Sequence, residues 1–229
     1  MLPSFSELKG KADALIFDVD GTLLDSMTVW NQADTVFLNS RGFEVTPDYT
    51  DYVKSVRIED AAVYTRDRYH LPDTPEQIMA EWNNFVNHAY SFTVPLKDGA
   101  YRYLKQSREK GFKTACATAL TRRNLDAAID RLGISGLFDV CISLEDTPGL
   151  PDKSEPDIYL HVAEALDVKP ERAVIFEDVP VALQGAAKGG FITCAVWDEI
   201  GAGNEENWAQ MTKFSDYYIR LWSELRNSP

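Results

Sequence analysis

The chain has 229 residues and a formal net charge of −13, from 23 Lys and Arg against 36 Asp and Glu. Its 45% hydrophobic and 26% charged residues are typical of a globular protein with a sizeable core, in one large domain or two of moderate size. The negative charge argues against nucleic-acid or anionic-membrane partners, because both would repel it. With no membrane-length apolar run, no signal-peptide core and no indication of a protein partner, we expect a cytoplasmic protein.

The first informative segment is an apolar run that ends in two carboxylates. Residues 14–17 show no polar alternation, which predicts a strand covered on both faces. Asp18 and Asp20 follow, and Gly21 permits a tight turn and a close approach of the backbone to a ligand. Taken alone, the segment is equally compatible with an ordinary strand that ends in a solvated turn.

The next region shows helical spacing without a strand pattern. Apolar residues recur at helical intervals over 29–37, 58–69 and 78–89, and residues 74–77 predict a capping box. We therefore predict a small all-helical cap domain at 26–93, inserted after the first strand. The remainder, residues 1–25 and 94–229, is predicted to form a single core domain.

From residue 98 onward, predicted helices and strands alternate. The predicted strands are 112–117, 138–142, 173–176 and 191–196, and the predicted helices are 98–110, 121–132, 157–167 and 180–188. This alternation implies parallel pairing and right-handed crossovers. We predict an α/β fold with a Rossmann-like three-layer core and a parallel sheet. The three cysteines, Cys116, Cys141 and Cys194, fall in expected strands without metal-binding spacing, and we interpret them as small buried hydrophobic side chains.

Polar groups accompany three of the later segments. Thr118 follows one strand, Glu177 and Asp178 follow another, and Lys153 stands in a loop before a helix. In an open parallel sheet, ligands bind at the carboxyl ends of the strands, so these residues are expected to converge there. Each has an ordinary alternative: a capping threonine, a surface lysine or an acidic turn. Their joint occurrence in this order favours a functional site.

These motifs together resemble those of the haloacid dehalogenase-like hydrolases, and within them the phosphatases and phosphomutases with a small helical cap. The resemblance covers nearly the whole chain. It implies that Asp18 is a nucleophile that forms an aspartyl-phosphate, and that Asp20 protonates the leaving oxygen and then deprotonates water. It also implies that Thr118 and Lys153 bind the phosphoryl group. The flanks of Lys153 depart from the usual pattern, because the family commonly has Gly before it and Pro after it.

The resemblance further implies a metal site. The expected ligands are Asp18, the backbone carbonyl of Asp20 and Asp178, with Glu177 ligating or holding a metal-bound water. These four acids sum to −4 and Lys153 returns +1, so a divalent cation brings the site to −1 and a protonated Asp20 brings it to 0. Magnesium is the expected cofactor, because it favours carboxylates, water and substrate phosphate.

The expected function is hydrolysis of a small phosphorylated metabolite, such as a sugar or polyol phosphate. Trp30, Arg57 and Arg122 (or its neighbour Arg123) are candidate substrate-binding residues. Their ordinary alternatives are cap packing for the tryptophan and solvated surface charge for the arginines.

Other functions remain as alternatives. A β-phosphoglucomutase is expected to have His where Trp30 stands, Arg near Ile58 and a Ser-Lys-Asn run after Thr118, and none of these is matched in place. A dehalogenase is disfavoured because those relatives lack an acid at the position of Asp20. A non-catalytic protein that binds a phosphorylated ligand is the third alternative, and the retention of every charged motif residue argues against it.

Overall fold

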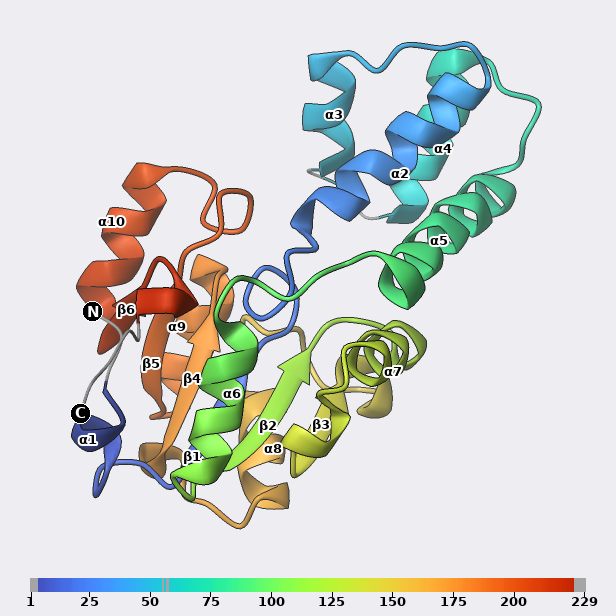
Figure 1. Cartoon of the computed structure of the whole chain (residues 1–229). Helices are drawn as coiled ribbons and strands as arrows, with labels where there is room; N and C mark the ends of the chain where they lie inside the picture. The colour runs from blue at the N-terminus through green and yellow to red at the C-terminus, as the bar shows by residue number, and fades with distance from the viewer. Residues whose placement is uncertain (1–3, 55, 57, 225–229) are drawn as a thin grey trace. The chain divides into compact units, whose positions relative to one another are not determined.

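The computed structural model of the chain describes residues 4–54, 56 and 58–224. It divides into two compact units (Figure 1). The first contains the residues up to Ser26 and those from Val94 onward, and the second is Met27–Thr93. We call them the core unit and the helical unit, and we describe each by itself.

The core unit is built on a six-stranded parallel sheet in the order β3-β2-β1-β4-β5-β6 (Figure 1). The strands are β1 (Ala14–Phe17), β2 (Lys113–Thr118), β3 (Val140–Ser143), β4 (Ala173–Glu177), β5 (Ile192–Val196) and β6 (Tyr217–Ile219). Strand β1 lies between β2 and β4, and all four of its residues are buried. The continuous apolar run is explained by this position, because both faces of a central parallel strand are covered.

Helices cover both faces of the sheet, which confirms the predicted three-layer core. On one face, α8 (Asp157–Ala165) and α9 (Pro180–Lys188) pack against the side chains of Ala14, Ile16 and their neighbours in β2 and β4. On the other face, Phe17 and Phe176 stack on each other and contact Tyr103 of α6 (Ala100–Glu109) and Trp222. The other helices of this unit are α1 (Phe5–Leu8), α7 (Arg122–Arg131) and α10 (Glu205–Phe214).

The helical unit contains α2 (Met27–Ser40), α3 (Pro47–Lys54), α4 (Ile58–Tyr69) and α5 (Pro75–Phe92). Helix α5 packs against both α2 and α4. The capping box at its start is present, with Thr74 accepting from the backbone of Gln77 and the Gln77 side chain accepting in return. Arg41, just after α2, forms ion pairs with Asp73, just before α5, and with Glu81 of α5, and so links α2 to α5.

Among the α-helices and strands of the described residues, α1, α3, α10 and β6 were not predicted from sequence. Strand β6 has only three residues at the edge of the sheet, so it shows no measurable alternation. Cys116 and Cys194 are buried as expected, but the expectation for Cys141 was wrong, because its strand lies at the opposite edge and leaves it partly exposed. None of the helices in the described part of the chain has the length and apolarity that a membrane crossing requires.

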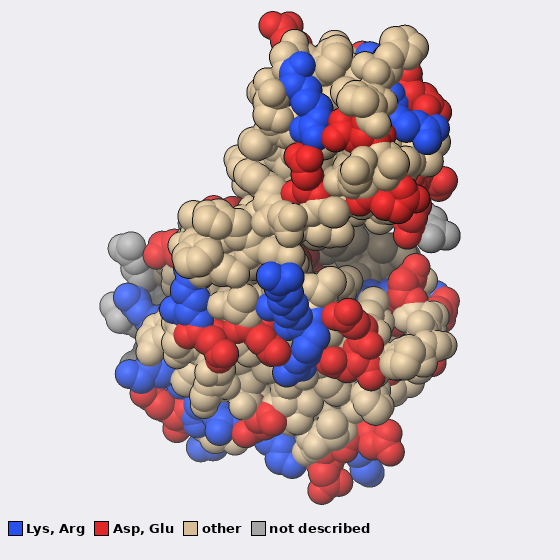
Figure 2. Space-filling view, turned by 90° about the vertical axis from the view of Figure 1, so that its right-hand side faces the viewer, with Lys and Arg blue, Asp and Glu red and all other residues tan. Residues whose placement is uncertain are grey.

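The surface carries charges of both signs. On the face drawn in Figure 2, Lys and Arg side chains lie among Asp and Glu side chains rather than in a patch of their own. With an overall charge of −13, an anionic ligand therefore needs local attraction at its binding site.

Candidate active site

The carboxyl ends of the central strands bring the predicted acids together. Asp18 follows β1, whereas Glu177 ends β4 and Asp178 comes directly after it. One carboxylate oxygen from each of the three lies within 4.8 Å of the others. All three are buried, with 6%, 1% and 1% of their surface exposed. Such close burial of like charges is costly unless positive charge compensates for it.

Lys153 supplies the positive charge found within this cluster. Its Nζ lies 2.5 Å from Asp18 Oδ1 and also forms an ion pair with Glu177. The ammonium lies 5.6 Å from the centre of the Tyr159 ring, and the Tyr159 hydroxyl donates to Glu177 Oε1 at 2.7 Å. Gly185 of α9 lets the lysine loop pack closely, because a Cβ there would overlap the backbone carbonyl of Lys153. The unusual flanks of Lys153 therefore do not keep it from this cluster.

The pKa values of the cluster reflect burial and crowding. Burial disfavours the charge on Lys153, but Asp18 and Glu177 more than offset this and raise its pKa. Burial and the Asp18 charge raise the pKa of Glu177 to about 7, although Lys153 and Tyr159 act in the opposite direction. Burial, followed by the charges of Asp18 and Glu177, raises the pKa of Asp178 well above its usual value. Protein groups alone thus leave the acids short of compensating charge.

The donor set of the cluster fits a divalent cation that prefers oxygen ligands. Asp178 Oδ1 accepts a hydrogen bond from Thr22 at 3.2 Å, whereas its Oδ2 is buried and has no hydrogen-bond partner among the described residues. The three carboxylates sum to −3 and Lys153 returns +1, so a divalent cation would bring this group to neutrality. Buried, unpaired carboxylate oxygen is the donor that hard cations bind.

Two further predicted residues lie at the same edge of the sheet. Asp20 is partly buried, and its Oδ1 accepts a hydrogen bond from Ser26 at 2.5 Å. Thr118 ends β2, is 1% exposed, and its Oγ1 accepts from the backbone N–H of Leu120 at 3.1 Å. Because that oxygen acts as the acceptor, the hydroxyl proton remains able to donate to a ligand.

Sequence reasoning missed a turn that packs closely against Asp178. A Cβ on Gly201 would overlap Asp178 Oδ2, so any larger residue would force the turn or the carboxylate to move. Asp198 Oδ1 accepts from the backbone N–H groups of Ile200 and Gly201 at 2.8 and 2.9 Å, and its Oδ2 pairs with Lys97 at 2.8 Å. Residues 198–201 lie beyond every motif that the sequence offered, so no local signal identified them.

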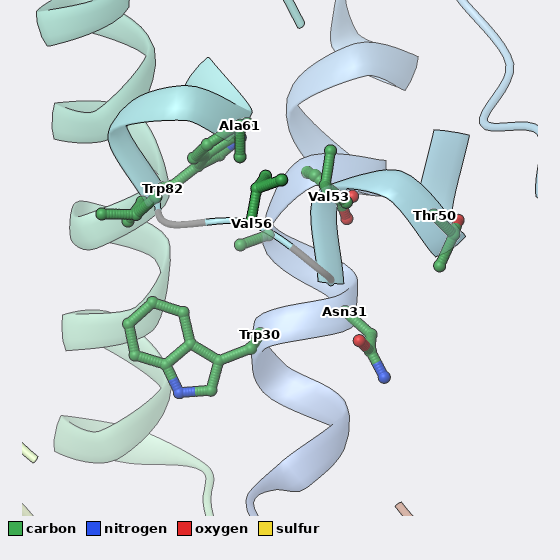
Figure 3. Close-up of a pocket in the computed structure, with 10 residues that line it drawn as sticks. Trp30, Asn31, Thr50, Val53, Val56, Ala61 and Trp82 are labelled. Carbon is green, nitrogen blue, oxygen red and sulfur yellow. The ribbon is translucent and has the colours of Figure 1, made fainter. Parts of the chain in front are cut away.

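The other predicted substrate-binding residues, Trp30, Arg57 and Arg122, belong to different parts of the chain. Trp30 lies on α2, is 42% exposed, and borders a cavity of about 200 Å³ in the helical unit (Figure 3). Arg122 pairs with Asp126 and Asp146 in the core unit. Arg57 lies outside the described residues. The cavity is lined by Trp30, Asn31, Ala33, Asp34, Thr50, Val53, Val56, Ile58, Ala61 and Trp82.

Comparison with known proteins identifies the family to which the chain belongs. A family model described as haloacid dehalogenase-like hydrolase matches residues 12–190. A phosphorylated carbohydrates phosphatase of Thermotoga maritima is 26% identical over 178 residues, covering 78% of this chain and 82% of the relative. Hexitol phosphatase B of Escherichia coli K12 is 27% identical over 175 residues, covering 72% and 74%. A solved structure of a candidate β-phosphoglucomutase from Thermotoga maritima has a TM-score of 0.79 at 23% identity, covering 91% of this chain and 94% of that one.

Proposed function

The chain belongs to the haloacid dehalogenase-like hydrolases and is a phosphoric monoester hydrolase, and from that premise we propose that it is a magnesium-dependent phosphatase acting on a small phosphorylated metabolite. A sugar or polyol phosphate is the proposed substrate class, because relatives carry names of that kind. The observation that carries the proposal is the contact of Asp18 with Lys153 beside two further buried acids.

Asp18 is the proposed nucleophile. It is the first residue beyond β1 and is fixed by the buried strand behind it, which suits an attack that must be in line with the leaving oxygen. Its carboxylate oxygen forms a bond to phosphorus as the bond to the substrate oxygen breaks, giving an aspartyl-phosphate. Asp20, two residues on, protonates that leaving oxygen and then removes a proton from the water that releases phosphate.

Lys153 and Thr118 are the proposed phosphoryl-binding groups. The ammonium of Lys153 is already within contact distance of the nucleophile, so a phosphoryl group held there would lie close to Asp18. Thr118 contributes a hydroxyl from the end of the neighbouring strand β2. A point charge and a neutral donor together offset the negative charge of the phosphoryl oxygens as they approach a carboxylate.

Asp18, the backbone carbonyl of Asp20 and Asp178 are the proposed ligands of Mg²⁺, with Glu177 as a further ligand or as the holder of a bound water. When bound, the cation supplies positive charge that offsets repulsion between the phosphoryl group and the carboxylates. Asp178 fits this assignment because its Oδ2 is buried without a protein partner among the described residues. Tyr159 and Lys153 both contact Glu177 Oε1, which fixes the position of this carboxylate.

A phosphomutase is the second candidate, since a structure with the name of one shares the fold. A mutase must protect its phosphorylated intermediate from water while a sugar bisphosphate reorients. For that task we expect His at the position of Trp30, Arg near Ile58 and Ser-Lys-Asn in the run that starts at Leu120. This chain has none of them in place. These positions favour hydrolysis.

The test supplies β-glucose 1-phosphate with a trace of the 1,6-bisphosphate and follows both products. We expect free phosphate to appear without build-up of glucose 6-phosphate. Formation of glucose 6-phosphate much faster than free phosphate would make the phosphatase proposal wrong. A panel of sugar, polyol and nucleoside phosphates, measured by phosphate release, would then identify the substrate class.

A further inference from the structure

Two of the three cysteines lie directly opposite each other in the sheet. Cys116 of β2 and Cys141 of β3 are register partners in a parallel pair. Neighbouring strands are about 4.8 Å apart, and residues that face each other in register project to the same side of the sheet. A disulfide requires Cα atoms roughly 4.4–6.8 Å apart, so this placement meets the distance requirement without moving the backbone.

The two thiols have different surroundings. Cys116 is fully buried, whereas Cys141 is partly exposed on the edge strand. A hydrogen bond with Cys116 and the nearby positive charge of Arg122 lower the pKa of Cys141, although burial acts against them. Arg122 is held at this position because its guanidinium donates to the Cys141 carbonyl at 2.9 Å. A partly exposed cysteine beside a cation, with a second cysteine opposite it, is the arrangement of oxidation-sensitive cysteine pairs.

We propose that Cys116 and Cys141 form a reversible disulfide when the chain meets a peroxide, with Cys141 oxidised first. The Cys141 thiolate attacks one peroxide oxygen, the O–O bond breaks, and the products are a sulfenic acid and, after protonation, water. The Cys116 sulfur then attacks the sulfenic sulfur and displaces its oxygen as a second water. Two thiols and one hydrogen peroxide thus give one disulfide and two waters.

Cys194 provides an internal control. It is buried in β5, where its register partners are Phe176 and Tyr217 rather than a cysteine. Burial raises its pKa above the usual value. It is therefore expected to remain a thiol under conditions that oxidise the pair. The proposal does not depend on the phosphatase assignment.

Peptide mapping of the folded, metal-free full chain gives a direct test. Trypsin cleaves after Lys113, Arg122 and Arg131, so it separates Cys116 and Cys141 into different peptides unless a disulfide joins them. The folded protein is treated with hydrogen peroxide, freed of peroxide, unfolded in denaturant with an alkylating reagent so that buried thiols also react, digested and analysed by mass spectrometry without reductant. We expect a cross-linked peptide pair two hydrogen masses below the sum of the separate peptides. Dithiothreitol should abolish it, and Cys194 should be alkylated throughout.

Two variants sharpen this test. Cys141→Ser should leave Cys116 as a thiol, because the first oxidation step is lost, whereas Cys194→Ser should form the cross-link like the original chain. The proposal is overturned if Cys141 proceeds to sulfinic acid without a cross-link. It is equally overturned if Cys141 joins a second chain instead, or if both thiols persist at a peroxide concentration that fully oxidises a small free thiol.

Discussion

The carboxyl edge of the core sheet and the cavity of the helical unit differ in the side chains that form them: ionisable ones at the first and mainly apolar ones at the second. At the sheet edge, the ionisable side chains of Asp18, Glu177 and Asp178 are buried, the Lys153 side chain is 10% exposed, and the four are in mutual contact or close to it. In the helical unit, apolar side chains predominate around a cavity of about 200 Å³, and Trp30 remains well exposed beside it. The first arrangement is costly to fold and the second is not.

From this contrast we expect the sheet edge to carry out the reaction and the cavity to influence which substrate is preferred. Buried like charges persist in a fold only where they are compensated, so the sheet edge is the part expected to tolerate no change. An apolar cavity wall exchanges side chains at a modest cost, so it is the part expected to set substrate preference. The five predictions below test this division, in order of decreasing effect.

Asp18→Asn should cause the largest loss. The side-chain volume is retained while the attacking charge is removed, so turnover should fall by more than about 10⁴-fold, to background. Phosphate release measures the loss, and circular dichroism checks that the fold survives. Asp13→Asn is the matched control, because Asp13 precedes the same strand and forms only a partly exposed ion pair with Arg172. Substantial residual turnover in Asp18→Asn would contradict an aspartyl-phosphate.

Removal of divalent metal should also abolish turnover. Excess chelator should reduce phosphate release to background, and magnesium should restore it, because Lys153 compensates only one of the three acids. Calcium should inhibit, since its looser and higher coordination would misplace Asp18. Full activity in excess chelator would remove the metal from the proposal.

Gly201→Ala should impair the sheet edge without touching a charged group. The added methyl overlaps Asp178 Oδ2, so either the turn or the carboxylate must move. A displacement of about 1 Å at such a site can cost about 10²-fold in turnover, and the magnesium concentration for half-activity should rise. Gly136→Ala is the control, because a Cβ there meets nothing within 4 Å. Equal activity of the two variants would show that the turn does not position Asp178.

Trp30→Ala should have a smaller and different effect. If Trp30 packs against the substrate, KM should rise about tenfold, equivalent to ~1.4 kcal/mol, with kcat little changed. Phe92→Ala provides an aromatic control in the same unit, since Phe92 is 67% exposed and does not line the cavity. A fall in kcat at constant KM would place Trp30 outside substrate selection.

The smallest expected effect is a pH dependence of stabilisation by magnesium. The folded pKa of Glu177, about 7, lies above the ordinary value of 4.5. The stabilisation linked to this shift is therefore complete below about pH 4.5 and is lost as the pH rises through about 7. Magnesium binds the ionised carboxylates, so its addition should raise Tm by a few °C more at about pH 8 than at about pH 5.5.

Thermal unfolding with and without magnesium at both pH values measures this difference. Glu177→Gln should weaken the pH dependence, because the titrating group is gone. An equal rise in Tm at both pH values in the original chain would contradict the assignment of Glu177 to the cation site.

The sequence by itself determined the fold class and most of the residues that meet at the sheet edge. The unbroken apolar run before Asp18 specified a central strand, and the helix–strand alternation specified a parallel sheet. These two inferences suffice to bring strand ends together, because all parallel strands present their carboxyl ends at one edge. The sequence also predicted helices in the insertion, because apolar residues recur there at the spacing of 3.6 residues per turn.

Only the tertiary structure decided which side chains support those residues. Tyr159 donates to Glu177, Gly201 packs against Asp178, and Cys141 of β3 lies opposite Cys116 of the neighbouring strand β2. None of these contacts has a local sequence signature, because each joins segments whose approach depends on strand register and loop path rather than on neighbouring residues. The periodicity of a chain fixes which way a side chain points within its element, whereas its partner is fixed only when the elements pack.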